Sequence, residues 1–160
     1  MIKVFLRGGL GNQMFQYATA LSIAKKQGTD VVLDTTFLAD RFPRKQFTYR
    51  TYDLDIFNIK PKFTLFSDLS ARMPIPGLWL ALDLAGVRLE DFIGAKKLIK
   101  EKKEYVFDPA IMDTGKNITL WGFWQTESYF KDVMNEIRTA FKFVPSHEPD
   151  IIKAREDIAN

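Results

Sequence analysis

The sequence predicts an α/β fold in which a parallel sheet is flanked by helices. A short apolar run at 2–6 reads as a buried strand, and a second run follows at 30–33. Between them lie a glycine-rich turn at 7–11 and a helical segment at 13–26. A strand, a helix and a strand in so short a stretch form a βαβ unit, whose strands are parallel. We therefore expect a Rossmann-like domain.

The first helix is defined at both ends. Asn12 is a favourable N-cap, and Gly28 is a natural stop after Lys25 and Lys26. Apolar residues cover most of its circumference, as in a helix packed on a sheet. A narrow polar stripe remains, formed by Gln16, Thr19, Ser22 and Lys26.

The rest of the chain is less regular. A third core strand is expected at 117–123, and a helix follows at 127–140. Weaker patterns predict a loop or short helix at 34–48, an extended piece at 52–57, a helical turn at 66–69, a short helix at 78–85, an exposed strand or hairpin at 96–105 and a helix at 149–160. We expect one domain over 1–145, with 146–160 beginning a linker or connecting helix.

Composition excludes several classes of protein. The chain has 160 residues, 46% apolar and 27% charged, which is typical of one globular domain. A net charge of +3 is too small to predict nucleic-acid binding. The absence of cysteine, with His147 the only histidine, excludes thiolate and multi-histidine metal sites.

The sequence also shows no recognisable targeting or membrane-spanning segment. The apolar run at 75–82 is far shorter than the roughly 20 residues of a membrane-spanning helix. No signal peptide is recognisable at the start. We expect a cytoplasmic protein, with peripheral contact to the inner face of the membrane as a further option.

The turn after the first strand is the main candidate site. Glycines 8, 9 and 11 let a ligand approach the backbone closely. The next helix directs free N–H groups and its positive dipole end toward this turn, which favours an electronegative ligand. The amides of Asn12 and Gln13 offer donors and acceptors for sugar hydroxyls. The competing interpretation is a tight βα turn without a ligand.

Two further clusters carry candidate chemistry. The aromatic cluster at 121–125 follows a core strand, where Trp124 and Gln125 are candidate acceptor-binding residues; the alternative is an aromatic core plug. Asp53 and Asp55 form an Asp-x-Asp pair, which some glycosyltransferases use to hold a metal. Their alternation with apolar residues favours two solvent-facing carboxylates instead, and no metal is expected.

Charged segments are expected to lie at the surface. A basic loop contains Arg41, Arg44, Lys45 and Arg50, and a run of mixed charge covers 96–103. His147 has no orienting partner nearby in the sequence, so we do not assign it as a base.

The longest motif runs Arg7-Gly8-Gly9-Leu10-Gly11-Asn12-Gln13-Met14-Phe15-Gln16-Tyr17-Ala18. It resembles, nearly residue for residue, the opening signature of the bacterial alpha-1,2-fucosyltransferase family. Weaker similarities lie at 52–58 and 122–130. The resemblance covers essentially the whole chain and is strongest at 2–34 and 117–143.

This resemblance implies a GT-B-type enzyme of two domains that transfers fucose from GDP-fucose to the 2-hydroxyl of a galactoside. Transfer in such enzymes inverts the anomeric centre and needs no metal or other cofactor. The implied partners are GDP-fucose and a galactose-containing acceptor glycan. Implied donor-binding residues are Gly9, Leu10, Gly11, Asn12 and Gln13, and no catalytic residue is assigned.

One departure from the family limits this expectation. The family carries a His-x-Arg-Arg-x-Asp motif that holds the donor phosphates, and this sequence contains no Arg-Arg pair. The chain therefore resembles the N-terminal half of a longer protein. We expect it to lack appreciable transferase activity alone, because arginines stabilise the negative charge of a departing GDP.

Two other functions stay open. A chain without its phosphate-binding half would behave as a non-catalytic sugar- or nucleotide-binding module. A Rossmann oxidoreductase is weakened by the incomplete Gly-x-Gly-x-x-Gly pattern, since Met14 stands at the third glycine position.

Overall fold

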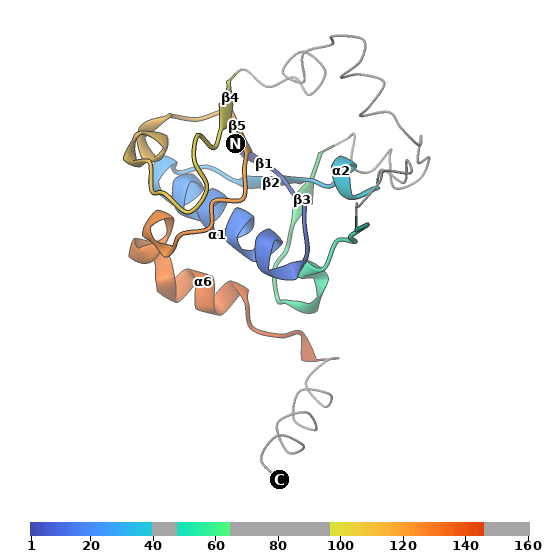
Figure 1. Cartoon of the computed structure of the whole chain (residues 1–160). Helices are drawn as coiled ribbons and strands as arrows, with labels where there is room; N and C mark the ends of the chain where they lie inside the picture. The colour runs from blue at the N-terminus through green and yellow to red at the C-terminus, as the bar shows by residue number, and fades with distance from the viewer. Residues whose placement is uncertain (40–47, 65–96, 146–160) are drawn as a thin grey trace.

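The computed structural model describes residues 1–39, 48–64 and 97–145, which form a parallel five-stranded sheet in the order β3-β2-β1-β5-β4. The strands are β1 (Ile2–Phe5), β2 (Val31–Asp34), β3 (Lys62–Phe63), β4 (Leu98–Lys100) and β5 (Ile118–Trp121). Each described pairing is parallel. β1 lies at the centre, because the chain continues to β2 on one side and reaches β5 on the other (Figure 1). The predicted α/β fold with a parallel sheet is confirmed.

Helices lie against both faces of the sheet. On one face, α1 (Leu10–Gln27) packs on the inward side chains of β1 and β5, and the shared cluster includes Ile2, Val4, Leu6, Ala20, Ile23, Ile118 and Leu120. Successive strand residues point to opposite faces, so Phe5 and Trp121 face the other way. Their rings are 5.0 Å apart, and Phe37 of α2 (Thr36–Ala39) lies 6.5 Å from Trp121.

The start of α1 differs from the prediction. The helix begins at Leu10, its N-cap is Gly9, and Asn12 lies inside the first turn. Gly8 adopts a φ of 79°, Gly9 is extended with a ψ of −177°, and helical geometry begins at Leu10. The C-terminal end is as predicted, because Gly28 is left-handed and its N–H binds the carbonyls of the last turn.

Three of the four residues in the polar stripe of α1 face inward, and Lys26 is exposed. Gln16 and Thr19 are fully buried and Ser22 is nearly so. The exposed positions of the helix are instead Gly11, Lys25 and Lys26. This side of α1 therefore lies against the protein, where Gln16 bonds the backbone of Arg7 and Gly122.

The extended piece predicted at 52–57 is wrong. Residues Leu54–Ile56 form a 3₁₀ helix, η1. Leu54 and Phe57 are both buried, and this i, i+3 spacing suits a 3₁₀ turn better than a strand.

The single helix predicted at 127–140 is also wrong. The segment contains two 3₁₀ turns, η3 (Glu127–Tyr129) and η4 (Lys131–Val133), before α6 (Met134–Ala140). Tyr129 and Phe130 are both buried although they are adjacent, and Phe130 leaves helical geometry at φ −136°. α6 then lies on the α1 side of the sheet, where Glu136 pairs with Lys25 at 3.4 Å (Figure 1).

The remaining predictions divide into two groups. β4 confirms an exposed edge strand within 96–105, and η2 (Pro109–Asp113) follows it. The features predicted at 66–69, 78–85 and 149–160, the boundary at 146, the residues Arg41, Arg44, Lys45 and His147, and the apolar run at 75–82 lie outside the described residues. Over the described part of the chain, none of the helices has the length and apolar character needed to cross a membrane.

Candidate functional site

The candidate site lies where the strand order reverses, between β1 and β5. These neighbouring parallel strands end at the same edge of the sheet, so the turn at 6–9 and the loop at 122–126 lie side by side. Ligands of open parallel α/β sheets bind at this reversal point. We call the sheet edge between the turn at 6–9 and the loop at 122–126 the crevice.

The turn presents backbone rather than side chains. Gly9 caps α1 without a side-chain hydrogen bond, and no acidic residue occupies the first turn. Gly11 is exposed, and a Cβ placed on it would meet nothing within 4 Å. The positive end of the dipole of this 18-residue helix therefore lies at an open N-terminus that no side chain caps. Of the predicted donor-binding residues, Gly9, Leu10 and Gly11 lie on this turn.

Gln13 is placed differently from the prediction. Its side chain is fully buried, and its Nε2 donates to the carbonyls of Gly8 at 2.9 Å and Thr51 at 2.7 Å. Its Oε1 accepts from the Asp53 N–H at 3.0 Å. These three bonds occupy the amide, so Gln13 holds the turn against segment 51–53 and does not face a donor.

Gln16 joins the two strands that border the crevice. It is fully buried; its Oε1 accepts from the Arg7 N–H at 3.1 Å, and its Nε2 donates to the Gly122 carbonyl at 3.1 Å. The sequence places Gly122 106 residues away from Gln16, so no local pattern predicts this bridge.

Arg7 supplies a cation beside the turn. Its guanidinium lies over Phe123, 4.1 Å from the ring centroid, and 5.4 Å from the Trp121 ring centroid. Its Nε is buried without a hydrogen-bond partner. Burial lowers the Arg7 pKa, an effect that Glu101 and Glu104 oppose, and arginine stays charged at neutral pH.

A second guanidinium lies next to Gly9 of the turn. The guanidinium carbon of Arg50 is 3.7 Å from the position that a Cβ on Gly9 would occupy. Sequence reasoning assigned Arg50 to a surface loop and gave Arg7 no role, although Arg7 directly precedes the glycines. Two arginines therefore lie near a backbone turn suited to an anion.

Glu101 supports the loop after β5. Its carboxylate accepts from the N–H groups of Phe123 at 2.7 Å and Trp124 at 3.0 Å. Trp124 has a left-handed φ of 58°, an unfavourable conformation for tryptophan that these bonds stabilise. The sequence placed Glu101 within a charged surface run, and only the parallel pairing of β4 with β5 shows its role.

Trp124 and Gln125, the two predicted acceptor-binding residues, point to different surroundings. Trp124 is 0% exposed and packs on Tyr129, so its ring has no free face for a sugar. Gln125 is half-buried, and its Nε2 donates to Asn12 Oδ1 at 2.9 Å. Trp124 is therefore a buried core residue, whereas Gln125 lies at the crevice.

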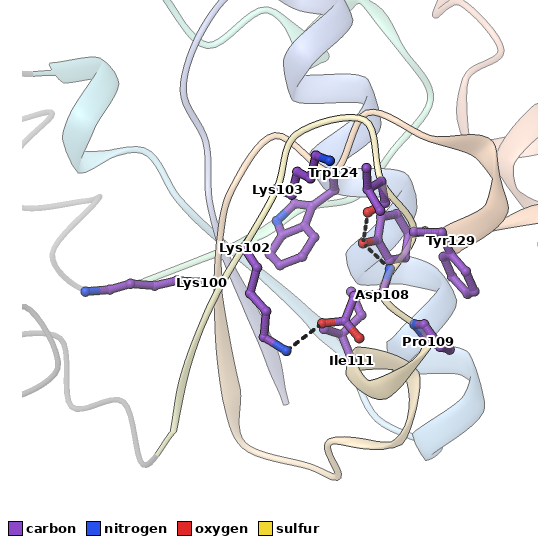
Figure 2. A pocket seen from close by; sticks show the side chains of 10 residues that line it. Lys100, Lys102, Lys103, Asp108, Pro109, Ile111, Trp124 and Tyr129 are labelled. Carbon is purple, nitrogen blue, oxygen red and sulfur yellow. Dashed lines mark hydrogen bonds and ion pairs between the residues drawn. The ribbon is translucent and has the colours of Figure 1, made fainter.

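A separate hollow of about 230 Å³ is lined by residues of β4, of the segment that follows it and of this loop (Figure 2). Trp124 and Tyr129 form part of its wall, and Lys102 bonds Asp108 at 3.0 Å across it. Lys100 points away from the other labelled side chains in Figure 2. The polar groups of this hollow bond one another, since the Tyr129 hydroxyl also accepts from the Asp108 N–H at 3.0 Å.

Asp53 and Asp55 of the Asp-x-Asp pair have different surroundings. Asp53 accepts from the Thr51 hydroxyl at 2.6 Å, and Asp55 is exposed on η1. Across residues 1–39, 48–64 and 97–145, no cluster of three or more histidine, aspartate or glutamate side chains could hold a metal ion.

The fold and crevice define a parallel α/β protein with an anion-compatible turn at its strand-reversal point. Comparisons with protein-family models, with curated proteins and with solved structures find no significant match to the chain.

Proposed function

We propose that the chain forms one wall of the donor site of a GT-B-type fucosyltransferase. The full protein would transfer fucose from GDP-fucose to the 2-hydroxyl of a galactoside with inversion, in glycan or surface polysaccharide synthesis. The proposal rests on the resemblance of the string Arg7–Ala18 to that family. The proposed reaction is cytoplasmic, with peripheral contact to the inner face of the membrane as a further option.

The observation that carries this proposal is the uncapped N-terminus of α1 at the strand-reversal point. A sugar nucleotide has a diphosphate, and helix N–H groups with a positive dipole end favour such an anion. Arg7, which directly precedes the glycines, and Arg50, next to Gly9, add positive charge near the turn. Glycine at 9 and 11 keeps the backbone accessible.

We expect the 160-residue chain alone to bind the donor but not to catalyse its transfer. Arg7 is engaged with aromatic rings and does not replace a pair of arginines aimed at the phosphates. We expect no appreciable transfer by the 160-residue chain, and measurable turnover of GDP-fucose would contradict this expectation.

Calorimetric titration with GDP-fucose, GDP and NADH tests the assignment. We expect GDP-fucose and GDP to bind and NADH not to bind. Binding of NADH alone would refute the glycosyltransferase proposal and favour an oxidoreductase. Binding of GDP-fucose to the chain, with no transfer by any longer form of the protein, would favour a non-catalytic binding module.

A further inference from the structure

Two side-chain amides meet across the crevice. Asn12 lies in the first turn of α1, and Gln125 lies in the loop after β5, 113 residues later in the sequence. Gln125 Nε2 donates to Asn12 Oδ1 at 2.9 Å. The bond joins the two segments that border the strand-reversal point, so the amides form one unit.

This bond leaves a defined set of groups available. Asn12 retains both N–H donors of its Nδ2, and Gln125 retains its Oε1 acceptor and one N–H. The part of the chain that the structure describes provides no other hydrogen-bond partner for either side chain. Both residues are half-buried, and neither amide is among the fully buried atoms that lack a partner. The remaining groups are therefore within reach of a ligand.

The orientation of the Asn12 amide is restricted by the turn. Its Nδ2 is 2.3 Å from the position that a Cβ on Gly8 would occupy, so the amide lies directly against that glycine. A donor amide and an acceptor carbonyl thus stand together beside the open helix terminus. Adjacent hydroxyls of a sugar ring, each able to donate and accept, complement such a pair.

We propose that Asn12 and Gln125 act together as one hydroxyl-recognition element for the hexose of the donor, with Gln125 in the donor subsite rather than the acceptor subsite. This inference rests on the proposed function. It separates two contributions to donor binding: backbone N–H groups and arginines bind the diphosphate, and the amide pair binds the sugar.

Dissociation constants for GDP-fucose and for GDP, measured on the full chain and its variants, test the inference. We expect Gln125→Met and Asn12→Ala each to weaken GDP-fucose binding about three- to tenfold and to leave GDP binding within twofold, as for the loss of one or two hydrogen bonds. The double variant is expected to bind GDP-fucose as tightly as the single variant with the lower affinity, because the two amides act as a unit. Asn135→Ala, an exposed amide on α6, is the matched control and should change neither constant.

The outcomes separate the two proposals. If the unmodified chain binds neither GDP nor GDP-fucose, the proposed function and this inference both fail. If it binds both ligands but Gln125→Met leaves the GDP-fucose constant unchanged, or the two substitutions weaken binding additively, only the inference fails. Thermal unfolding of each variant, with Gln125→Glu as a second substitution, identifies a loss of binding that comes from loss of folding.

Discussion

Replacing Gln16 by leucine tests the internal bridge of the crevice. The substitution keeps side-chain bulk but removes both bonds, leaving the Arg7 N–H and the Gly122 carbonyl without partners. Each buried polar group left unpaired costs about 1–3 kcal/mol. The two unpaired groups together, reduced by the gain from a more apolar side chain, should lower the free energy of unfolding by about 3 kcal/mol. This is a large part of the roughly 5–15 kcal/mol that stabilises a domain.

Urea denaturation followed by tryptophan fluorescence measures this loss, with a constant m-value showing that the folded state is unchanged. Thr19→Val is the matched control, because Thr19 lies on the same buried side of α1 but its hydroxyl has no hydrogen-bond partner among the described residues. That variant should be as stable as the unmodified chain or slightly more stable. A loss below about 1 kcal/mol for Gln16→Leu, or equal losses for both variants, would refute the bridge.

Three further changes test neighbouring features. Gly8→Ala should lower the unfolding free energy by about 2 kcal/mol, since φ is 79° and the new Cβ would stand 2.3 Å from Asn12 Nδ2; unchanged denaturation would contradict this. Arg7→Gln should weaken GDP binding about tenfold by calorimetry and leave guanosine binding unchanged, whereas equal losses would show that Arg7 does not bind phosphate. Burial raises the pKa of Tyr52 in the folded state above its unfolded-state value of about 10. The folded state therefore keeps its full stability below about pH 10 and becomes less stable as the pH rises further, because the unfolded chain then loses the proton first. Tyr52→Phe should reduce that alkaline loss in denaturation series at about pH 7 and 10.5, without destabilising the protein at pH 7, because the hydroxyl is buried without a partner; an unchanged alkaline slope would oppose this.

The βαβ unit was predictable because its signals are local. Parallel strands buried on both faces read as continuous apolar runs, and Gly28 ends the intervening helix by its own conformation. The same local reasoning misplaced the start of α1, because Asn12 is a good cap in isolation but its side chain bonds Gln125 instead. A distant partner therefore overrode the local preference.

Errors at 127–140 and in the candidate site have the same physical origin. The spacing of Phe130, Val133 and Ile137 predicts a continuous helix, but burial of the adjacent Tyr129 and Phe130 breaks it. Side-chain amides near a glycine-rich turn favour the prediction of ligand-binding groups. The amide of Gln13 instead bonds the backbone of Gly8, Thr51 and Asp53. Which amide faces the crevice depends on contacts that no sequence pattern contains.

Gly11 separates what the fold requires from what a ligand requires. Gly8 is needed for its positive φ and Gln16 for its bridge, so a ligand-free scaffold would keep both. Nothing stands within 4 Å of a Cβ on Gly11, and glycine within a helix is less stable than alanine by about 0.5–1 kcal/mol. The fold alone therefore favours alanine at this position.

If the space over Gly11 receives a donor, Gly11→Ala should raise the unfolding free energy by about 0.5–1 kcal/mol and weaken GDP-fucose binding at least about tenfold, because the methyl group occupies ligand space. Denaturation and calorimetry on the same variant measure both effects. Higher stability with unchanged GDP-fucose affinity would show that the ligand does not contact this turn. A gain in stability with a loss of binding has no explanation in the scaffold, and assigns the open face of the turn to ligand recognition.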